Sequence, residues 1–369
     1  MSVAVLGLGL VLLRCGSSDS GGGPAGGSGG TSGGASGGAS GHAGAAQAGA
    51  THAGSGNAGA GHAGESSGGG AGESEAGSAG ASEAGAGGEG PGQGVAETLK
   101  YVFNKQSIPT TMGQFAADLN GDTVDDNQYA VVGATLAAQG VIPQATSDAE
   151  TAAGRGLELS LLHVADSNLV KSAGAILDLA RASEKASPDF GGTGMFTIDA
   201  TAPSATLPGA IAGGVFTSKP VQVGEKPQKL SLRLPFGVAI DVPVYVFSVK
   251  THVAENGFTT GQLNGAMLAT DVDALVPPAL ATTLNATCAG VNSTSATCLA
   301  FLTTFDTDHN KTISADEVRA NTLVKAVLGP DLKLFDALGK YAPSTAANAV
   351  KDSFSVGIGF TAVTAVFAE

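Results

Sequence analysis

A long stretch that cannot form a hydrophobic core is the feature that most limits how this chain can fold. More than half of the 57 Gly lie between Gly16 and Gly94, a stretch without Lys, Arg, Phe or Tyr. Such a composition cannot bury enough apolar surface to offset the entropy that is lost on ordering. We therefore predict a disordered Gly/Ala/Ser-rich tether at 16–94. The folded part, 95–369, holds all 14 Phe and all 4 Tyr and is long enough for a substantial core.

The first 15 residues have the features of an export signal. A short apolar run, 3–13, is followed by Arg14, Cys15 and Gly16. The run is shorter than the about 20 residues that a membrane-spanning helix needs, and its length suits the apolar region of a signal peptide. Segment 1–15 resembles bacterial lipoprotein signals, although Arg14 stands where a small residue is usual and no Lys or Arg precedes the run. An ordinary export signal and a cytosolic protein are the alternatives.

The resemblance extends to Gly-rich-tethered bacterial lipoproteins of unknown function. It implies that Cys15 carries the lipid and that the membrane is a partner through this anchor. It also implies an exported protein at the outer membrane or cell surface, with a periplasmic or secreted protein as the alternative. The net charge of −14 argues against nucleic acid as a partner, because phosphate recognition requires a basic surface.

The folded part shows strand patterns at both ends of a helical region. Residues 230–234 alternate between Leu and polar residues, Asn256-Gly257 is a hairpin-turn signal, and 354–360 alternates large apolar residues with Ser and Gly. A helical insert is predicted at about 271–347. We therefore predict an α+β fold: a sandwich-like or curved antiparallel sheet with a C-terminal strand, interrupted by this insert.

The strongest motif is a set of oxygen-bearing residues in segment 306–317, within the part of the insert at about 285–330. Counted from Asp306, oxygen side chains occupy positions 1, 3, 5, 9 and 12, and position 7 can offer its carbonyl. These candidate Ca²⁺ ligands are Asp306, Asp308, Asn310, Thr312, Ser314 and Glu317. Alternate residues of a tight loop can turn their oxygens inward, and Ca²⁺ binds about six to eight oxygens. The flanks are predicted to be helices with apolar faces, which include Leu299 before the loop and Leu323 after it. With these flanks, segment 298–328 resembles the EF-hand family, which implies a helix–loop–helix calcium site.

One position departs from the EF-hand pattern. Position 6, usually Gly because its φ is positive, is Lys311. A residue with a side chain costs about 1 kcal/mol there, and the ammonium repels a cation. We therefore expect a dissociation constant of about 10⁻⁴ to 10⁻³ M, as in extracellular modules. The alternative is a helix–turn–helix with a solvated acidic loop.

A second acidic loop, 118–126, precedes a predicted helix at 129–139. Its candidate Ca²⁺ ligands, at alternate positions, are Asp118, Asn120, Asp122, Val124 through its carbonyl, and Asp126. The spacing resembles short calcium loops of extracellular repeats, and like charges so close together repel one another unless a cation is present. A solvated turn without metal is the alternative.

Two cysteines lie just before the predicted metal loop. Cys288 and Cys298 are close in sequence, and in an exported protein such a pair indicates a disulfide. The bridge would fix the start of the helix that leads into the loop. Two buried thiols are the alternative.

These features favour a binding or structural protein over an enzyme. Ca²⁺ is then structural, and the ligand of the folded part, a protein or a polysaccharide, is unidentified. The alternative is a Ca²⁺-stabilised secreted hydrolase whose carboxylates are dispersed in the sequence. A cleft containing two carboxylates with raised pKa would favour the hydrolase.

Overall fold

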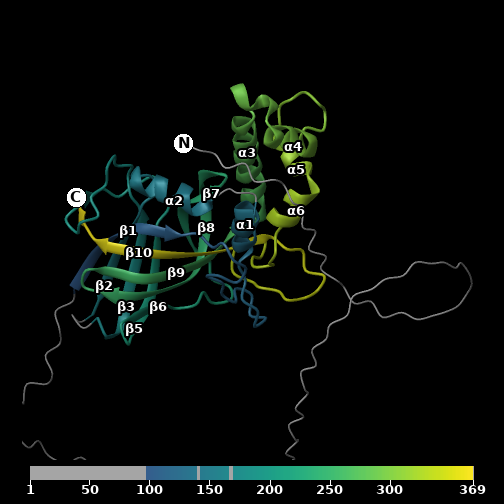
Figure 1. Ribbon diagram of the computed structural model, residues 1–369. Coiled ribbons are helices and arrows are strands. Elements are labelled where there is room, and N and C mark those ends of the chain that lie inside the picture. The colour runs from purple at the N-terminus through teal and green to yellow at the C-terminus, as the bar shows by residue number, and fades with distance from the viewer. Residues whose placement is uncertain (1–96, 139–141, 166–168, 369) are drawn as a thin grey trace, which may run out of the picture. The chain divides into compact units, whose positions relative to one another are not determined.

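The structure is a computed structural model that describes residues 97–138, 142–165 and 169–368 (Figure 1). The predicted signal segment 1–15 with Cys15, and the predicted tether 16–94, lie outside the described residues. Every helix and strand of the structure therefore falls within the predicted folded part, 95–369.

The main sheet has nine strands in the order β6-β5-β3-β2-β1-β10-β9-β8-β7. Each neighbouring pair is antiparallel. The strands are β1 (Glu97–Ser107), β2 (Glu158–Val164), β3 (Lys171–Arg181), β5 (Ala205–Ala212), β6 (Val215–Ser218), β7 (Gln228–Phe236), β8 (Val238–Ala254), β9 (Gly257–Leu268) and β10 (Ser353–Thr364). Two short strands, β4 (Met195–Phe196) and β11 (Val366–Phe367), pair in parallel as a separate sheet. As predicted, the C-terminal region supplies a long strand, which lies between β1 and β9.

The length of β8 closes the sheet on itself. β8 has 17 residues, and on one side it pairs with β9. On its other side, the first half pairs with β7, and the second half pairs with β6 from Val215 opposite His252 to Thr217 opposite Lys250. Eight strands thus form a closed barrel, and β7 is an additional strand. The prediction of an α+β fold with a curved antiparallel sheet is confirmed, whereas its sandwich-like form is wrong, because the β6–β8 pairing joins the edges that a sandwich leaves open.

Large apolar side chains pack together as the main core of the barrel. Phe103 of β1 and Phe360 of β10 stack with ring centroids 4.2 Å apart, and Tyr101 lies against Phe258 at 4.6 Å. The opposite face of β10 is covered as well. A Cβ added at Gly357 would lie 1.9 Å from the carbonyl oxygen of Phe115, so only Gly allows this close approach.

Most of the helices stand together beside the barrel, and one, α2 (Pro143–Ala152), lies apart from them against β1 and β7 (Figure 1). The other helices are α1 (Gln128–Ala138), α3 (Ala269–Thr287), α4 (Ala296–Phe305), α5 (Ala315–Ala320) and α6 (Thr322–Leu328), with a 3₁₀ helix at Gly290–Thr294. α3 follows β9 directly and contributes Val272 and Val276 to the barrel core and Ala281 to a separate core among the helices. Among the described helices, none has both the length and the apolar character that crossing a membrane requires.

The helical insert ends earlier than predicted. The last helix stops at Leu328, before Gly329 and Pro330, and the chain up to β10 contains no further helix in the described residues. Leu332, Leu334 and Phe335 instead pack on the outside of β8 and β9. These three residues therefore belong to an irregular segment that covers the barrel, where the sequence predicted a helix.

A chain of ion pairs ties α2 to β3, β7 and β8. Glu150 of α2 accepts hydrogen bonds from Arg155 at 2.6 Å and from Arg233 at 2.6 Å. Arg233 also contacts Asp241 at 3.1 Å, and Asp241 accepts a hydrogen bond from Arg181 at 2.6 Å. The hydrogen bonds from Arg155 and Arg233 lower the pKa of Glu150 to about 2. Glu150 therefore contributes to this network only while its carboxylate is ionised.

Replacing Glu150 by Gln should lower the stability of the protein in a pH-dependent way. Because the folded-state pKa of Glu150 lies below the unfolded value of 4.5, its contribution is complete above pH about 5 and disappears as the pH falls to about 2. We expect a loss of about 1 kcal/mol at pH 7, a value reduced for the solvent that reaches the arginines. Chemical denaturation across this pH range measures it. Glu255→Gln, in an exposed hairpin turn, is the control, and a loss that stayed constant with pH would contradict the assignment.

Candidate metal centre

Three carboxylates of the predicted calcium loop lie together. One ligand oxygen from each of Asp306, Asp308 and Glu317 falls within 4.8 Å of the others. Asp306 is 4% exposed and Glu317 is 9% exposed, whereas Asp308 faces solvent. Like charges this close repel one another, and a divalent cation would neutralise them.

The backbone of the loop is folded around these carboxylates. The two oxygens of Asp306 accept hydrogen bonds from the N–H of Asn310 at 3.0 Å and of Lys311 at 2.8 Å. Asn310 Oδ1 in turn accepts the N–H of Thr312 at 2.7 Å. Lys311 has φ 67°, the left-handed conformation expected at position 6. The side chains at positions 1 and 5 therefore hold the turn that brings the loop back on itself.

Glu317 closes the loop from its far end. Its Oε1 accepts the N–H of Thr307 at 2.6 Å, and its Oε2 accepts the N–H and hydroxyl of Ser314 at 2.8 and 2.9 Å. These hydrogen bonds, first those of Ser314 and then those of Thr307, lower the pKa of Glu317 to about 2. The carboxylate is therefore ionised at neutral pH and is suited to a metal ion.

Helices frame both ends of the loop. α4 ends at Phe305, directly before Asp306. α5 begins after Ser314, which forms with Glu317 the capping box that the sequence indicates. Ile313, 1% exposed, packs between Ala281 of α3 and Val318 of α5. The structure thus brings three of the six predicted ligand residues, Asp306, Asp308 and Glu317, together where α4 ends and α5 begins.

Parts of the predicted helix pattern are wrong. Leu299 and Leu323, expected on apolar faces, are 51% and 54% exposed. The outgoing helix is not continuous: Asn321 ends α5 and caps α6, where its Oδ1 accepts the N–H groups of Leu323 and Val324. The break turns α6 to a new direction, so that Val324 packs on the helical core and Leu323 does not.

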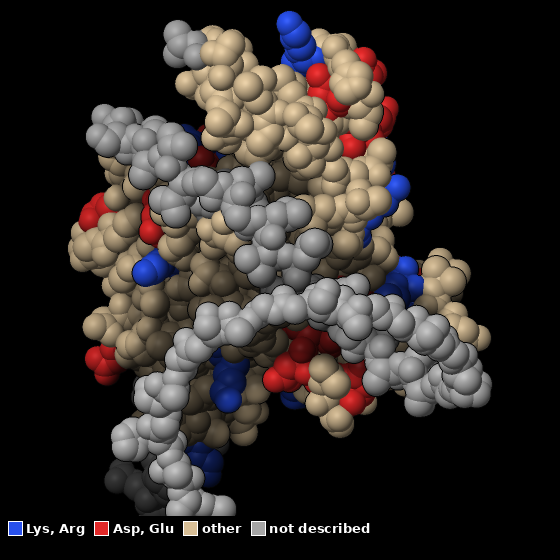
Figure 2. Space-filling model, turned by 45° about the vertical axis from the view of Figure 1, so that its right-hand side comes forward, with Lys and Arg blue, Asp and Glu red and all other residues tan. Residues whose placement is uncertain are grey.

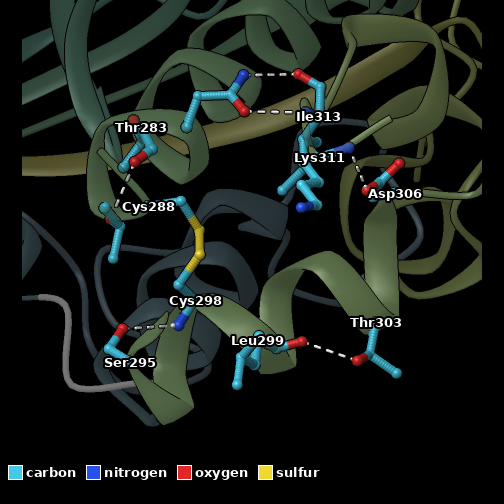
Figure 3. Close-up of a disulfide and its surroundings, with 11 residues drawn as sticks. Thr283, Cys288, Ser295, Cys298, Leu299, Thr303, Asp306, Lys311 and Ile313 are labelled. Atoms are coloured by element: carbon cyan, nitrogen blue, oxygen red, sulfur yellow. Dashed lines mark hydrogen bonds between the residues drawn. A yellow bond between two sulfur atoms is a disulfide. The ribbon is translucent and has the colours of Figure 1, made fainter. Parts of the chain in front are cut away.

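The predicted disulfide is present. Cys288 and Cys298 are joined, with their Cα atoms 4.9 Å apart (Figure 3). Ser295 accepts the N–H of Cys298 at 3.1 Å and so caps α4 at the same point. The bridge therefore connects the end of α3 to the first turn of the helix that enters the loop.

The second acidic loop has a similar backbone. Asp118 accepts the N–H groups of Gly121 at 2.7 Å and Thr123 at 2.9 Å, and Thr123 has φ 71°. Asn120 and Asp122 accept the N–H groups of Asp122 and Val124 at 3.0 and 2.8 Å. Asp126 instead accepts the N–H of Leu119 at 3.1 Å. Metal binding by this loop stays a prediction.

Two carboxylates beside the second loop have raised pKa values. Burial, with repulsion from Asp331, raises the pKa of Asp126 to about 6, and burial also raises that of Asp331. Neither lines the two open hollows of about 270 and 310 Å³ that lie near Lys185 and near Asn256. These two hollows therefore do not bring together the carboxylate pair that would favour a hydrolase.

His163 belongs to a polar chain that the sequence did not indicate. Its two ring nitrogens contact the hydroxyl of Thr98 at 2.9 Å and a carboxylate oxygen of Asp178 at 2.8 Å, across β1, β2 and β3. The three side chains lie on the outer face of the barrel and line neither hollow. Strand pairing, which sets this contact, is not visible in the sequence spacing.

No protein family, curated protein or solved structure matches the chain. The candidate site therefore rests on its own geometry.

Figure 2 shows acidic side chains gathered on the helical part, with a basic side chain beside them.

Replacing Lys311 by Gly should raise the free energy of unfolding of the calcium-free protein. A side chain in the left-handed conformation costs about 1 kcal/mol, and Gly removes this cost. Loss of the ammonium should also tighten calcium binding by about twofold. Denaturation and calcium titration measure the two effects.

Thr123→Gly is the matched control, because Thr123 occupies the same position of the second loop with a similar φ. It should give a comparable gain in stability and leave calcium binding at 306–317 unchanged. A Lys311→Gly protein no more stable than the wild type would contradict the strain assigned to Lys311.

Proposed function

We propose that loop 306–317 binds Ca²⁺ and that the protein is a calcium-binding exported protein of the cell envelope, anchored by a lipid on Cys15. The observation that carries this proposal is the grouping of Asp306, Asp308 and Glu317 within 4.8 Å. Asn310 and Ser314 would bring further side-chain oxygens, and Thr312 would bring a carbonyl. An all-oxygen set of this kind suits a hard cation such as Ca²⁺ better than a metal that prefers nitrogen or sulfur.

The surroundings of the loop support a structural role for the ion. Ile313 of the loop and Val318 of α5 pack with Ala281 of α3, and α3 continues directly from β9. An ion bound by Asp306 and Glu317 would join the end of α4 to the start of α5. Calcium would thus hold helices α3 to α6 together beside the barrel. In this proposal the barrel has the binding or structural function of the protein.

The disulfide supports the exported location. Disulfides persist mainly in oxidising compartments outside the cytosol. The Cys288–Cys298 bridge therefore fits an exported protein. Calcium outside the cell is abundant enough for a site with a dissociation constant of about 10⁻⁴ to 10⁻³ M. The proposed lipid anchor rests on the sequence around Cys15, and the proposed ligand class is a protein or a polysaccharide.

Thermal unfolding with calcium or with a chelator tests the proposal. At about 10 mM Ca²⁺ the midpoint of the wild-type protein should rise by about 5 °C, since a ligand that binds only the folded state stabilises it. Glu317→Gln should lose most of this rise, because Gln cannot bind the ion with two charged oxygens. Circular dichroism measures both midpoints.

Asp316→Asn is the matched control, since it removes a neighbouring carboxylate whose side chain is 92% exposed and pairs with Arg319. It should keep the full calcium response. If calcium moved the midpoint of neither the wild type nor this control, the loop would not be a calcium site.

A further inference from the structure

One side chain of α3 holds the centre of the candidate calcium loop. Asn285 Nδ2 donates to the carbonyl of Ile313 at 2.7 Å, and Asn285 Oδ1 accepts the N–H of Ile313 at 2.9 Å. Figure 3 shows the two bonds that converge on Ile313. A backbone N–H and carbonyl that point to the same side are normally paired by a neighbouring strand. Here one amide side chain pairs both.

The place of Ile313 makes this contact important for the metal. It lies between Thr312 and Ser314, which bring the oxygens of positions 7 and 9 to the site. The contact fixes the peptide groups on both sides of Ile313. The side chain of Ile313 is itself buried among the helices, which holds this residue in place from its other side. Asn285 therefore sets the direction of the Thr312 carbonyl without being a ligand.

α3 also holds the helix that leaves the loop. Pro277 has no N–H, so the carbonyl of Asp273, four residues earlier, lacks its helical donor. Arg319 of α5 supplies one: its Nη2 donates to this carbonyl at 3.0 Å and its Nε donates to Asp273 Oδ1 at 2.8 Å. Arg319 lies two residues after Glu317, so this contact holds the turn that carries the last ligand.

The disulfide supplies the third connection from α3. Cys288 caps the C-terminal end of α3, and its partner Cys298 lies in the first turn of α4. α3 thus holds three parts of the site: α4, the centre of the loop at Ile313, and α5. The loop needs no second loop or second copy of the chain beside Ile313, because Asn285 already occupies that edge.

We propose that Asn285 is a positioning residue of the calcium loop, which presets the ligand oxygens through Ile313. The inference rests on the proposed function, since it requires that loop 306–317 binds Ca²⁺. Preset ligands lose less conformational freedom on binding, so removal of the Asn285 contact should weaken calcium binding.

The test compares calcium affinity in the full chain for the wild type, Asn285→Ala and Val276→Ala. The N–H signals of the loop, followed by NMR during titration with CaCl₂ at 25 °C, give the dissociation constants. Asn285→Ala should bind calcium about tenfold more weakly, from the loss of two hydrogen bonds to the loop. Val276→Ala removes buried apolar contacts of α3 in the barrel core. It should lower the unfolding midpoint and leave the affinity unchanged, which separates positioning from stability.

The outcomes distinguish the two proposals. A wild-type protein that does not bind calcium removes the proposed function, and the inference with it. A wild-type protein that binds, with Asn285→Ala equal to it in affinity, overturns the inference alone. If Asn285→Ala does not fold at 25 °C, Asn285→Ser takes its place, because the shorter hydroxyl cannot reach both atoms of Ile313. Equal affinity for that variant overturns the inference in the same way.

Discussion

The pairing of β6 with the second half of β8 is the interaction on which the rest of the structure depends. It leaves no open edge between β6 and β8, and the eight strands enclose one continuous core. α3 starts at the end of β9, beside β8, and its first turns belong to that core. The closed sheet therefore fixes the position of α3, and α3 fixes the position of the candidate metal loop.

Features set by neighbouring residues could be predicted from the sequence. The ligand spacing from Asp306 to Glu317, the capping box at Ser314 and the Cys288–Cys298 bridge each involve residues that are close along the chain. The C-terminal strand was also visible, because its large apolar residues alternate strictly. In these segments the local pattern and the final structure agree.

Features set by distant contacts could not be predicted. The sheet closes through residues 215–217 and 250–252, and no sequence periodicity reports such a pairing. Leu299 and Leu323 fit an apolar helix face, but both are exposed; for Leu323 the reason is that Asn321 breaks the outgoing helix. Asn285 looked like any polar residue of a helix, since its role depends on Ile313, 28 residues later in the chain. The grouping of Asp306, Asp308 and Glu317 could thus be predicted, and the contact of Asn285 that holds the segment could not.

The hydrogen bonds of Glu317 have a consequence for how the protein responds to its surroundings. The carboxylate accepts N–H and hydroxyl groups of Thr307 and Ser314, at the same oxygens that a metal ion would use. Metal binding would therefore exchange these hydrogen-bond partners and would not have to order a free coil. A loop built in this way keeps its shape in calcium-poor surroundings, because the hydrogen bonds of Thr307 and Ser314 hold Glu317 in place when no ion is bound.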